Sequence, residues 1–456
     1  MTTAPRPQAT SSRTYRFPNV ERSTLPNGLQ VVTAPMPRLP LVTVLALVDA
    51  GAACDPRGAE GVASLTVETL REGTKRLPGA ALTEQFELLG TELTVATDWD
   101  SVILRLTVTP GRLEAAVALL GEVLCTPAFT VRDVERVQAE RLAELLQREA
   151  EPRGLADDKF SEHLYVSGAR YALPEAGSAS SVRALDAIRV REFHQEHFVP
   201  RASTLLLVGD VTPEQAVLLA ERNLGAWSGT AAVRPRVDDE TVSGTRRVIV
   251  VNKSGAPQSE LRIGHRGVPR PHPDYFAIVV MNAVLGGLFS SRLNLNLRER
   301  HAFTYGVQSA FDWRRGTGPF VISTAVNTES TGAATREILD EISRMRDETV
   351  AAEELSLATA YLDGVFPIRY ETTQAVAEGL STAEVYGLGE DYFDRYRDRV
   401  RAVTSDDVHR AARTFLHPHD LLILAVGDAR TIRAPLEKLA LGPVEVYGPT
   451  EDRTST

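Results

Sequence analysis

Residues 284–305 read Val284-Leu-Gly-Gly-Leu-Phe-Ser-Ser-Arg-Leu-Asn-Leu-Asn-Leu-Arg298-Glu299-Arg-His-Ala-Phe-Thr-Tyr305. A glycine pair and a serine pair lead into leucines at helical spacing, which predicts an amphipathic helix that ends near Arg298. The chain then enters an expected strand over 305–311 that begins with Tyr305. Taken alone, this pattern is explained by a helix-end arginine in an ion pair and a strand tyrosine in the core.

A second stretch, in the first half of the chain, reads Gly61-Val-Ala63-Ser64-Leu-Thr-Val67-Glu68-Thr-Leu-Arg-Glu-Gly73-Thr74. The two stretches together resemble the pitrilysin/insulinase-type zinc metallopeptidases. The later stretch matches that family's second-half pattern, L-G-G-x-x-x-S-R-L-x-x-x-L-R-E-x-x-x-x-x-Y. The seven-residue separation of Arg298 and Tyr305 and the preceding glycines and serines favour this interpretation over the ordinary ion pair and core tyrosine.

The resemblance implies roles for residues in the second half. Arg298 and Tyr305 would be catalytic and would reach across a chamber towards a zinc ion. The residues before them would bind substrate, namely Gly286, Gly287, Ser290 and Ser291.

The first half keeps the flanking residues of the family's zinc motif and lacks its metal-binding and catalytic residues. The family pattern is G-x-A-H-x-x-E-H-x-x-x-x-G-T, an inverted zinc motif on a helix. Ser64 and Glu68 stand at the two histidine positions, and Val67 stands at the position of the catalytic glutamate. Valine cannot accept a proton from water, and serine is a poor zinc ligand beside imidazole, carboxylate or thiolate. We therefore expect this chain to hold no metal.

Glu144 matches the family's third zinc ligand, 76 residues after Glu68. It is vestigial by this interpretation, because a catalytic zinc needs about three protein ligands and a water. Two histidine pairs are weaker candidates for a metal site. His194 and His197 have neither the H-x-x-E-H nor the H-E-x-x-H arrangement, and His417 and His419 flank a proline before a strand. We interpret all four as scaffold residues.

The chain is predicted to be a duplicated α+β protein. Each half is expected to form a mainly antiparallel sheet with helices on one face, over 20–227 and 246–442, with a linker at 228–245. Both halves close on a helix, a proline turn and an apolar strand that ends in Gly-Asp, at Asp210 and Asp428. The tail after about Gly442 is predicted to be disordered.

Composition narrows the class and compartment. The 456 residues are 43% hydrophobic and 24% charged, as in globular proteins. The net charge of −10 gives no electrostatic reason to expect nucleic acid as a partner. The start of the chain has no apolar core of a secretory signal, and no apolar run is long enough to span a bilayer, so we expect a cytoplasmic protein without a membrane.

Two functions remain open. In the first, the chain is the non-catalytic, metal-free subunit of a heteromeric zinc metallopeptidase. A homologous zinc-bearing subunit would be its heterodimer partner, peptides would be its substrates, and Arg298 and Tyr305 would act in trans. In the second, it is a catalytically inert structural or peptide-binding core subunit of a larger complex. Retention of Arg298 and Tyr305 favours the first function, because a scaffold does not need that pair.

Overall fold

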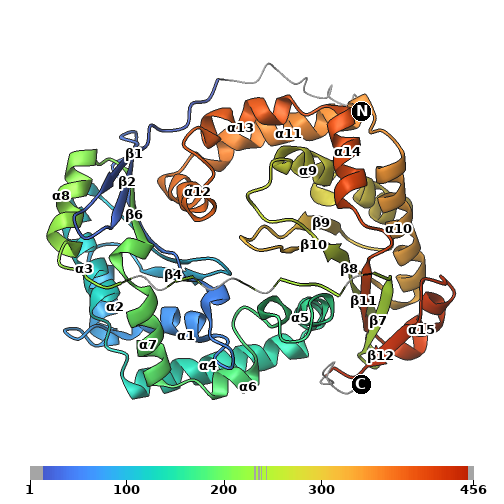
Figure 1. The fold of residues 1–456 in the computed structure, drawn as a ribbon, viewed down its shortest axis with the longest axis horizontal. Helices are drawn as coiled ribbons and strands as arrows, with labels where there is room; N and C mark the ends of the chain where they lie inside the picture. Colours follow the sequence, from blue (N-terminus) through green and yellow to red (C-terminus); the bar gives the residue numbers. More distant parts are fainter. Residues whose placement is uncertain (1–13, 231–232, 235–236, 238, 243, 450–456) are drawn as a thin grey trace, which may run out of the picture.

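The computed structural model describes residues 14–230, 233–234, 237, 239–242 and 244–449. The described chain forms two halves that lie on opposite sides of Figure 1. Across these residues, no helix combines the length and the apolar character needed to cross a membrane.

The N-terminal half contains one six-stranded sheet and the helices that cover it. Its strands are β1 (Glu21–Thr24), β2 (Gln30–Pro35), β3 (Val42–Val48), β4 (Thr94–Thr97), β5 (Val102–Val108) and β6 (Ser203–Gly209). Its helices are α1 (Val62–Thr69), α2 (Gly79–Leu88), α3 (Leu113–Cys125), α4 (Val131–Ala150), α5 (Pro152–Leu164), α6 (Ala179–Arg183), α7 (Ala187–His197) and α8 (Pro213–Leu224).

The C-terminal half repeats this plan. Its strands are β7 (Arg247–Asn252), β8 (Gln258–Arg266), β9 (Val307–Phe311), β10 (Pro319–Asn327), β11 (Leu422–Gly427) and β12 (Val444–Tyr447). Its helices are α9 (Tyr275–Asn282), α10 (Thr331–Asp347), α11 (Ala352–Arg369), α12 (Thr373–Tyr386), α13 (Tyr392–Arg401), α14 (Ser405–Phe415) and α15 (Ala429–Glu437). Two π-helical turns, Ala283–Gly287 and Asn294–Arg300, follow α9.

The strand orders confirm the expected duplication. The N-terminal sheet runs β1-β2-β6-β3-β5-β4 and the C-terminal sheet runs β12-β7-β11-β8-β10-β9. In the N-terminal sheet the Gly-Asp strand β6 is parallel to β2 and antiparallel to β3. In the C-terminal sheet the Gly-Asp strand β11 is parallel to β7 and antiparallel to β8. Each sheet is mixed, with antiparallel pairs in the majority, as the predicted fold class requires.

The expectation of a disordered tail was wrong for residues 444–447, and residues 450–456 lie outside the described residues. Residues 444–447 form β12, which pairs in parallel with β7. The segment gains its order from backbone hydrogen bonds to a strand almost 200 residues earlier, and local composition cannot reveal such pairing.

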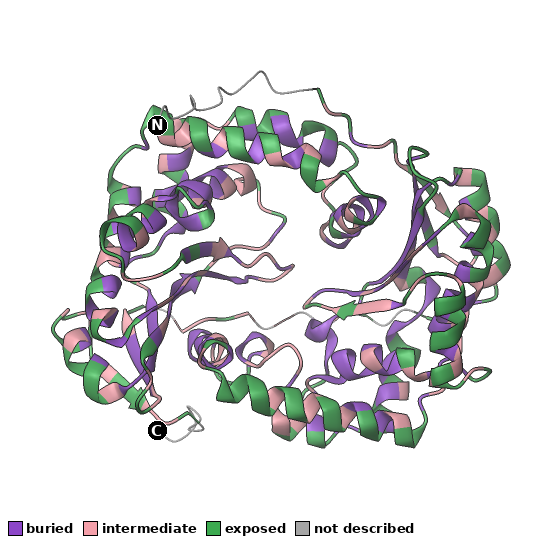
Figure 2. Ribbon diagram, turned by 180° about the vertical axis from the view of Figure 1, so that it is seen from behind, coloured by how far each residue is buried: buried purple, intermediate pink, exposed green. Residues whose placement is uncertain are grey.

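Each half contributes one helix to the inner face of the other half's sheet. Alternate residues of each strand point to an outer helical layer, formed by α3 and α8 in one half and by α10 and α15 in the other (Figure 1). The inner face of the N-terminal sheet packs against α12 of the C-terminal half, and the inner face of the C-terminal sheet packs against α5 of the N-terminal half. Figure 2 shows the resulting burial along the strands of both sheets.

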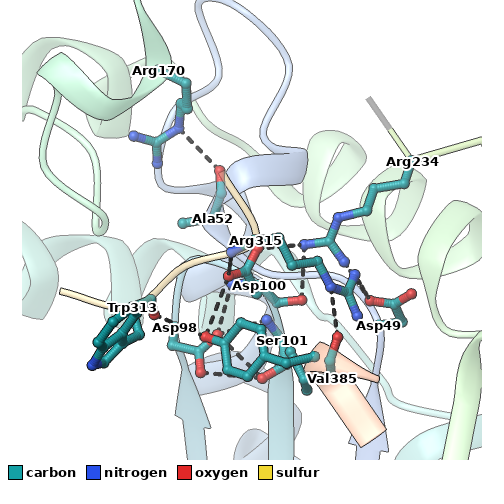
Figure 3. A network of polar contacts seen from close by, with 11 residues as sticks. Asp49, Ala52, Asp98, Asp100, Ser101, Arg170, Arg234, Trp313, Arg315 and Val385 are labelled. Atoms are coloured by element: carbon teal, nitrogen blue, oxygen red, sulfur yellow. Dashed lines mark hydrogen bonds and ion pairs between the residues drawn. The ribbon is translucent and has the colours of Figure 1, made fainter. Parts of the chain in front are cut away.

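A polar cluster joins the halves near the inner ends of the sheets (Figure 3). Asp100, which is 1% exposed, accepts hydrogen bonds from the Arg234 side chain at 3.0 Å and from the Arg315 backbone N–H at 2.8 Å. The hydroxyl of Tyr386, at the end of α12, donates to the backbone oxygen of Trp313 at 3.0 Å. Burial raises the pKa of Asp100 to about 6, although Arg234 and Arg314 oppose this rise. Residues from both halves and from the linker therefore fix how the two sheets face each other.

Candidate functional site

The C-terminal half contains a cavity of about 500 Å³ beside the π-helical turns. Tyr305, Phe289 and both glycines of the Gly286-Gly287 pair line it, together with residues of β8, β9 and β10. Arg153, at the start of α5, lines it from the N-terminal half. The cavity is therefore framed by the segment whose sequence carried the resemblance.

Tyr305 has an almost fully exposed side chain, at 94%. It lies in a bend before β9, so the strand begins at Val307 rather than at Tyr305 as predicted. Among the described residues none forms a hydrogen bond with the Tyr305 hydroxyl, and the phenol is free to donate one. Exposed tyrosines are unexceptional singly, but this one lies at the mouth of a cavity.

Asn294 holds the segments on either side of this cavity. Its side-chain amide donates to the backbone oxygens of Leu288 at 3.1 Å and Val307 at 2.8 Å, and its oxygen accepts from the Val307 N–H at 3.2 Å. Asn294 is only 6% exposed. One buried amide thus fixes both the loop that carries Phe289 and the loop that carries Tyr305.

The outer edge of β9 is closed by side chains. Asn294 satisfies both backbone groups of Val307, and Asn282 donates to the Ser309 oxygen at 2.9 Å. These asparagines lie on or beside the π-helical turns, a form that is often found at functional sites. Because both backbone groups of Val307 and the backbone oxygen of Ser309 are already paired, this part of β9 offers little to an added peptide strand.

Arg298 lies apart from the cavity lining. Its guanidinium stacks on the ring of Phe289, 4.2 Å from the centroid, and lies 3.6 Å from a carboxylate oxygen of Glu299. Phe289 is itself 72% exposed and does line the cavity. Arg298 therefore contacts a residue of the cavity lining without lining the cavity itself.

The predicted substrate-binding residues have different surroundings. Gly286 is buried, and a Cβ there would lie 2.5 Å from the hydroxyl of Ser309, so close packing requires glycine. Gly287 is exposed and lines the cavity. Ser291 is buried and accepts a hydrogen bond from Asn294, whereas Ser290 is exposed, and neither serine lines the cavity.

The N-terminal half contains a cavity of about 510 Å³ at the degenerate motif. Ser64 and Glu68 on α1 line it, and so does Glu144 on α4. Val67 is 1% exposed and packs in the core of this half. Ala96 and Thr97 of the edge strand β4 form another wall.

Arg141 is the residue at this site that the sequence analysis missed. Its guanidinium lies 2.8 Å from a carboxylate oxygen of Glu144 and 3.9 Å from one of Glu68. The available signal was its spacing, because Arg141 lies one helical turn before Glu144 on α4. Glu68 also pairs with Arg71. Both acidic residues at ligand positions are thus engaged by arginines.

The donor set of this site does not fit zinc. A hydroxyl and two arginine-paired carboxylates replace the two imidazoles and the free carboxylate of the family pattern, and no histidine lines the cavity. Throughout the described ranges, no group of three or more histidine, cysteine, aspartate or glutamate residues is arranged to bind a metal ion.

The histidine pairs lie in scaffold positions. His194 is 9% exposed and contacts the Leu124 backbone oxygen through Nε2 at 2.9 Å, and burial lowers its pKa to about 4. His197 packs on Phe193, and burial lowers its pKa as well. The ring of His417 packs on His265 at the entrance to β11. His419, two residues later, is exposed.

Comparisons with known proteins place this geometry in one family. The model described as Insulinase (Peptidase family M16) matches residues 30–170, and the model described as Peptidase M16 inactive domain matches residues 184–362. An uncharacterized zinc protease of Streptomyces coelicolor is 24% identical over 402 residues, covering 87% of each chain. A probable mitochondrial-processing peptidase subunit beta of Schizosaccharomyces pombe is 25% identical over 433 residues, covering 91% of this chain and 93% of the relative.

The same fold is found in solved structures. A crystal structure from Pseudomonas fluorescens, described as a peptidase M16 inactive domain, superposes with a TM-score of 0.84 at 24% identity. The match covers 90% of this chain and 98% of that one. A chain of Complex III2 from Candida albicans superposes with a TM-score of 0.76 at 16% identity, covering 92% of this chain and all of that one.

Proposed function

The chain belongs to the insulinase family, peptidase family M16, and on that premise we propose that it is the metal-free subunit of a heteromeric zinc peptidase. A homologous partner chain carries the zinc in this proposal. The observation that carries it is the free, 94% exposed hydroxyl-bearing side chain of Tyr305 at the mouth of a cavity. A half-site of this kind is useful only if another chain supplies the other half.

The chemistry assigned to this chain is transition-state stabilisation. Zinc in the partner supplies an activated water. The Tyr305 hydroxyl donates a hydrogen bond to the oxyanion that forms on the attacked peptide carbonyl, and the Arg298 guanidinium, held on Phe289, adds positive charge. Neither role requires a proton acceptor, which is consistent with Val67 at the position of the catalytic base.

The sheet edges suggest how a peptide would bind. An extended peptide pairs with the unpaired backbone groups of an edge strand. The edge of β9 is closed by Asn282 and Asn294, whereas β4 ends its sheet and borders the N-terminal cavity. We therefore assign peptide binding by strand addition to β4, over residues 94–97.

Native purification tests this function. The tagged chain is isolated from its own cells in chelator-free buffer, and co-eluting chains are identified and their zinc is measured. We expect a homologous chain with an intact H-x-x-E-H motif and its zinc. Recovery in a stable assembly that lacks any such chain would instead favour the inert structural subunit.

A further inference from the structure

The strongest unassigned feature is the arginine at the degenerate motif. Arg141 on α4 lies between Glu68, at the position of the second histidine ligand, and Glu144, at the position of the third ligand. We propose that the Arg141 guanidinium replaces the metal ion as the cation that ties α1 to α4. The site is then a built-in ion-pair site rather than an empty metal site.

Burial supports this assignment. The Arg141 side chain is 19% exposed and that of Glu68 is 27% exposed, so the pair is partly shielded from water. Glu144 is more open, at 64%, and is held by Arg141 from one turn away on the same helix. A charged side chain at a partly buried helix crossing needs a counter-charge; Glu68 has Arg71 from its own helix, and Arg141 is the cation of α4 that faces both Glu68 and Glu144.

A second ion pair repeats the tie one turn further along. Arg136 of α4 pairs with Glu72, which lies four residues after Glu68 just beyond α1. Two carboxylates, of Glu68 and Glu72, therefore face two arginines of α4. The second pair involves neither Ser64 nor Glu144, so Arg136 serves as a matched control for Arg141.

The consequence is that restoring the motif alone will not restore the metal. A dication placed among residues 64, 68 and 144 would face the positive charge of Arg141 and would compete with it for Glu144. Metal affinity should therefore depend on a fourth position outside the family motif. Metal binding by the isolated chain does not depend on the proposed heteromer.

Three engineered chains test it. The first carries Ser64→His and Glu68→His, which supply the two imidazole ligands and leave Val67 in the core of its half. The second adds Arg141→Val, and the third instead adds Arg136→Val. Zinc affinity is measured by competition with a chromophoric chelator, and circular dichroism checks the fold. We expect the Arg141→Val addition to tighten zinc binding by at least about tenfold, and the Arg136→Val addition to change it less than about twofold.

Equal zinc affinity in the first and second chains would overturn the proposal, as would equal gains from the two arginine substitutions. A second measurement uses the otherwise native chain, in case the engineered chains unfold. Arg141→Met and Glu68→Gln should have non-additive effects on the melting temperature, whereas Arg141→Met and Glu72→Gln should add. Additive effects for the first pair would also contradict the assigned tie.

Discussion

The two halves of this molecule share one topology and differ in what their cavities offer. In the N-terminal half, arginines engage the carboxylates at the former ligand positions. In the C-terminal half, a buried amide holds two loops in place and leaves the Tyr305 side chain free. The duplication has therefore preserved the scaffold in both halves, while the chemistry depends on a few side chains carried by that scaffold.

The difference extends to the sheet edges. Equivalent edge strands, β4 and β9, border the two cavities. Side-chain amides pair with backbone groups of Val307 and Ser309 on β9, whereas β4 is the strand to which we assign peptide binding. In the proposed function, the N-terminal half would hold an extended peptide and the C-terminal half would contribute the Tyr305 hydroxyl.

The largest expected effect comes from removing that hydroxyl. In the reconstituted pair, Tyr305→Phe should lower kcat by about 10²–10³-fold, because one oxyanion donor is lost. Stability should be unchanged, since the side chain is exposed. Tyr361→Phe is the matched control, because Tyr361 is 53% exposed on α11 and lies outside the cavity lining. Equal losses of activity in both variants, or unfolding of Tyr305→Phe, would remove the distinction between the halves.

A smaller loss is expected at Arg298. Arg298→Ala should lower kcat by about tenfold, less than Tyr305→Phe, because the guanidinium is held on Phe289 and adds charge rather than a direct first donor. Steady-state kinetics of the pair measures this loss. A Phe289→Leu variant, which frees the guanidinium, should retain more activity than Arg298→Ala. Lower activity in Phe289→Leu than in Arg298→Ala would mean that activity depends on the aromatic ring of Phe289 and not on the charge of Arg298.

The buried amide gives a test of stability. Asn294→Leu leaves the buried N–H of Val307 without its side-chain acceptor, and should reduce the free energy of unfolding by about 1–3 kcal/mol. Asn294→Asp keeps an acceptor for that N–H and serves as the comparison. Denaturant unfolding measures both. A neutral Asn294→Leu variant would show that the loops around Tyr305 are held by other contacts.

The contact between the halves should depend on pH. Burial raises the pKa of Asp100 from its usual value near 3.8 to about 6, so the folded state binds this proton more tightly than the unfolded state does. The contribution of Asp100 to stability is therefore fully present below about pH 4 and is lost as the pH rises through about 6. Asp100→Asn should flatten the melting temperature between pH 4 and 7. An unchanged pH profile in this variant would assign the titration to other buried carboxylates.

Local patterns were sufficient to predict much of the architecture. Apolar periodicity and the repeated Gly-Asp strand endings predicted the paired sheets, and β6 and β11 confirm that prediction. The exchange of α5 and α12 was not predictable, because it depends on contacts between segments that are far apart in sequence. The bend at Tyr305 was also missed, since hydrogen bonds from Asn294, a residue outside the strand, set where β9 begins.

The candidate site was predictable only in part. The absence of the family's zinc ligands and catalytic base could be predicted from residue types alone, at Ser64, Val67 and Glu68. The contact of Arg141 with Glu68 depends on the crossing of α1 and α4, which no spacing along the chain defines. The position of Arg298 behind Phe289 is likewise a tertiary feature, and only the structure separates the surroundings of Arg298 from those of Tyr305.

The most direct test of the account separates the two chains of the proposed heteromer and measures zinc and peptide hydrolysis for each. This chain alone should contain no stoichiometric zinc and should not hydrolyse peptides. The zinc-bearing chain that co-purifies with it should recover full activity only when the two are mixed, and mixing with the Tyr305→Phe variant should not restore it. About one zinc per isolated chain, or robust hydrolysis by this chain without a partner, would contradict the account.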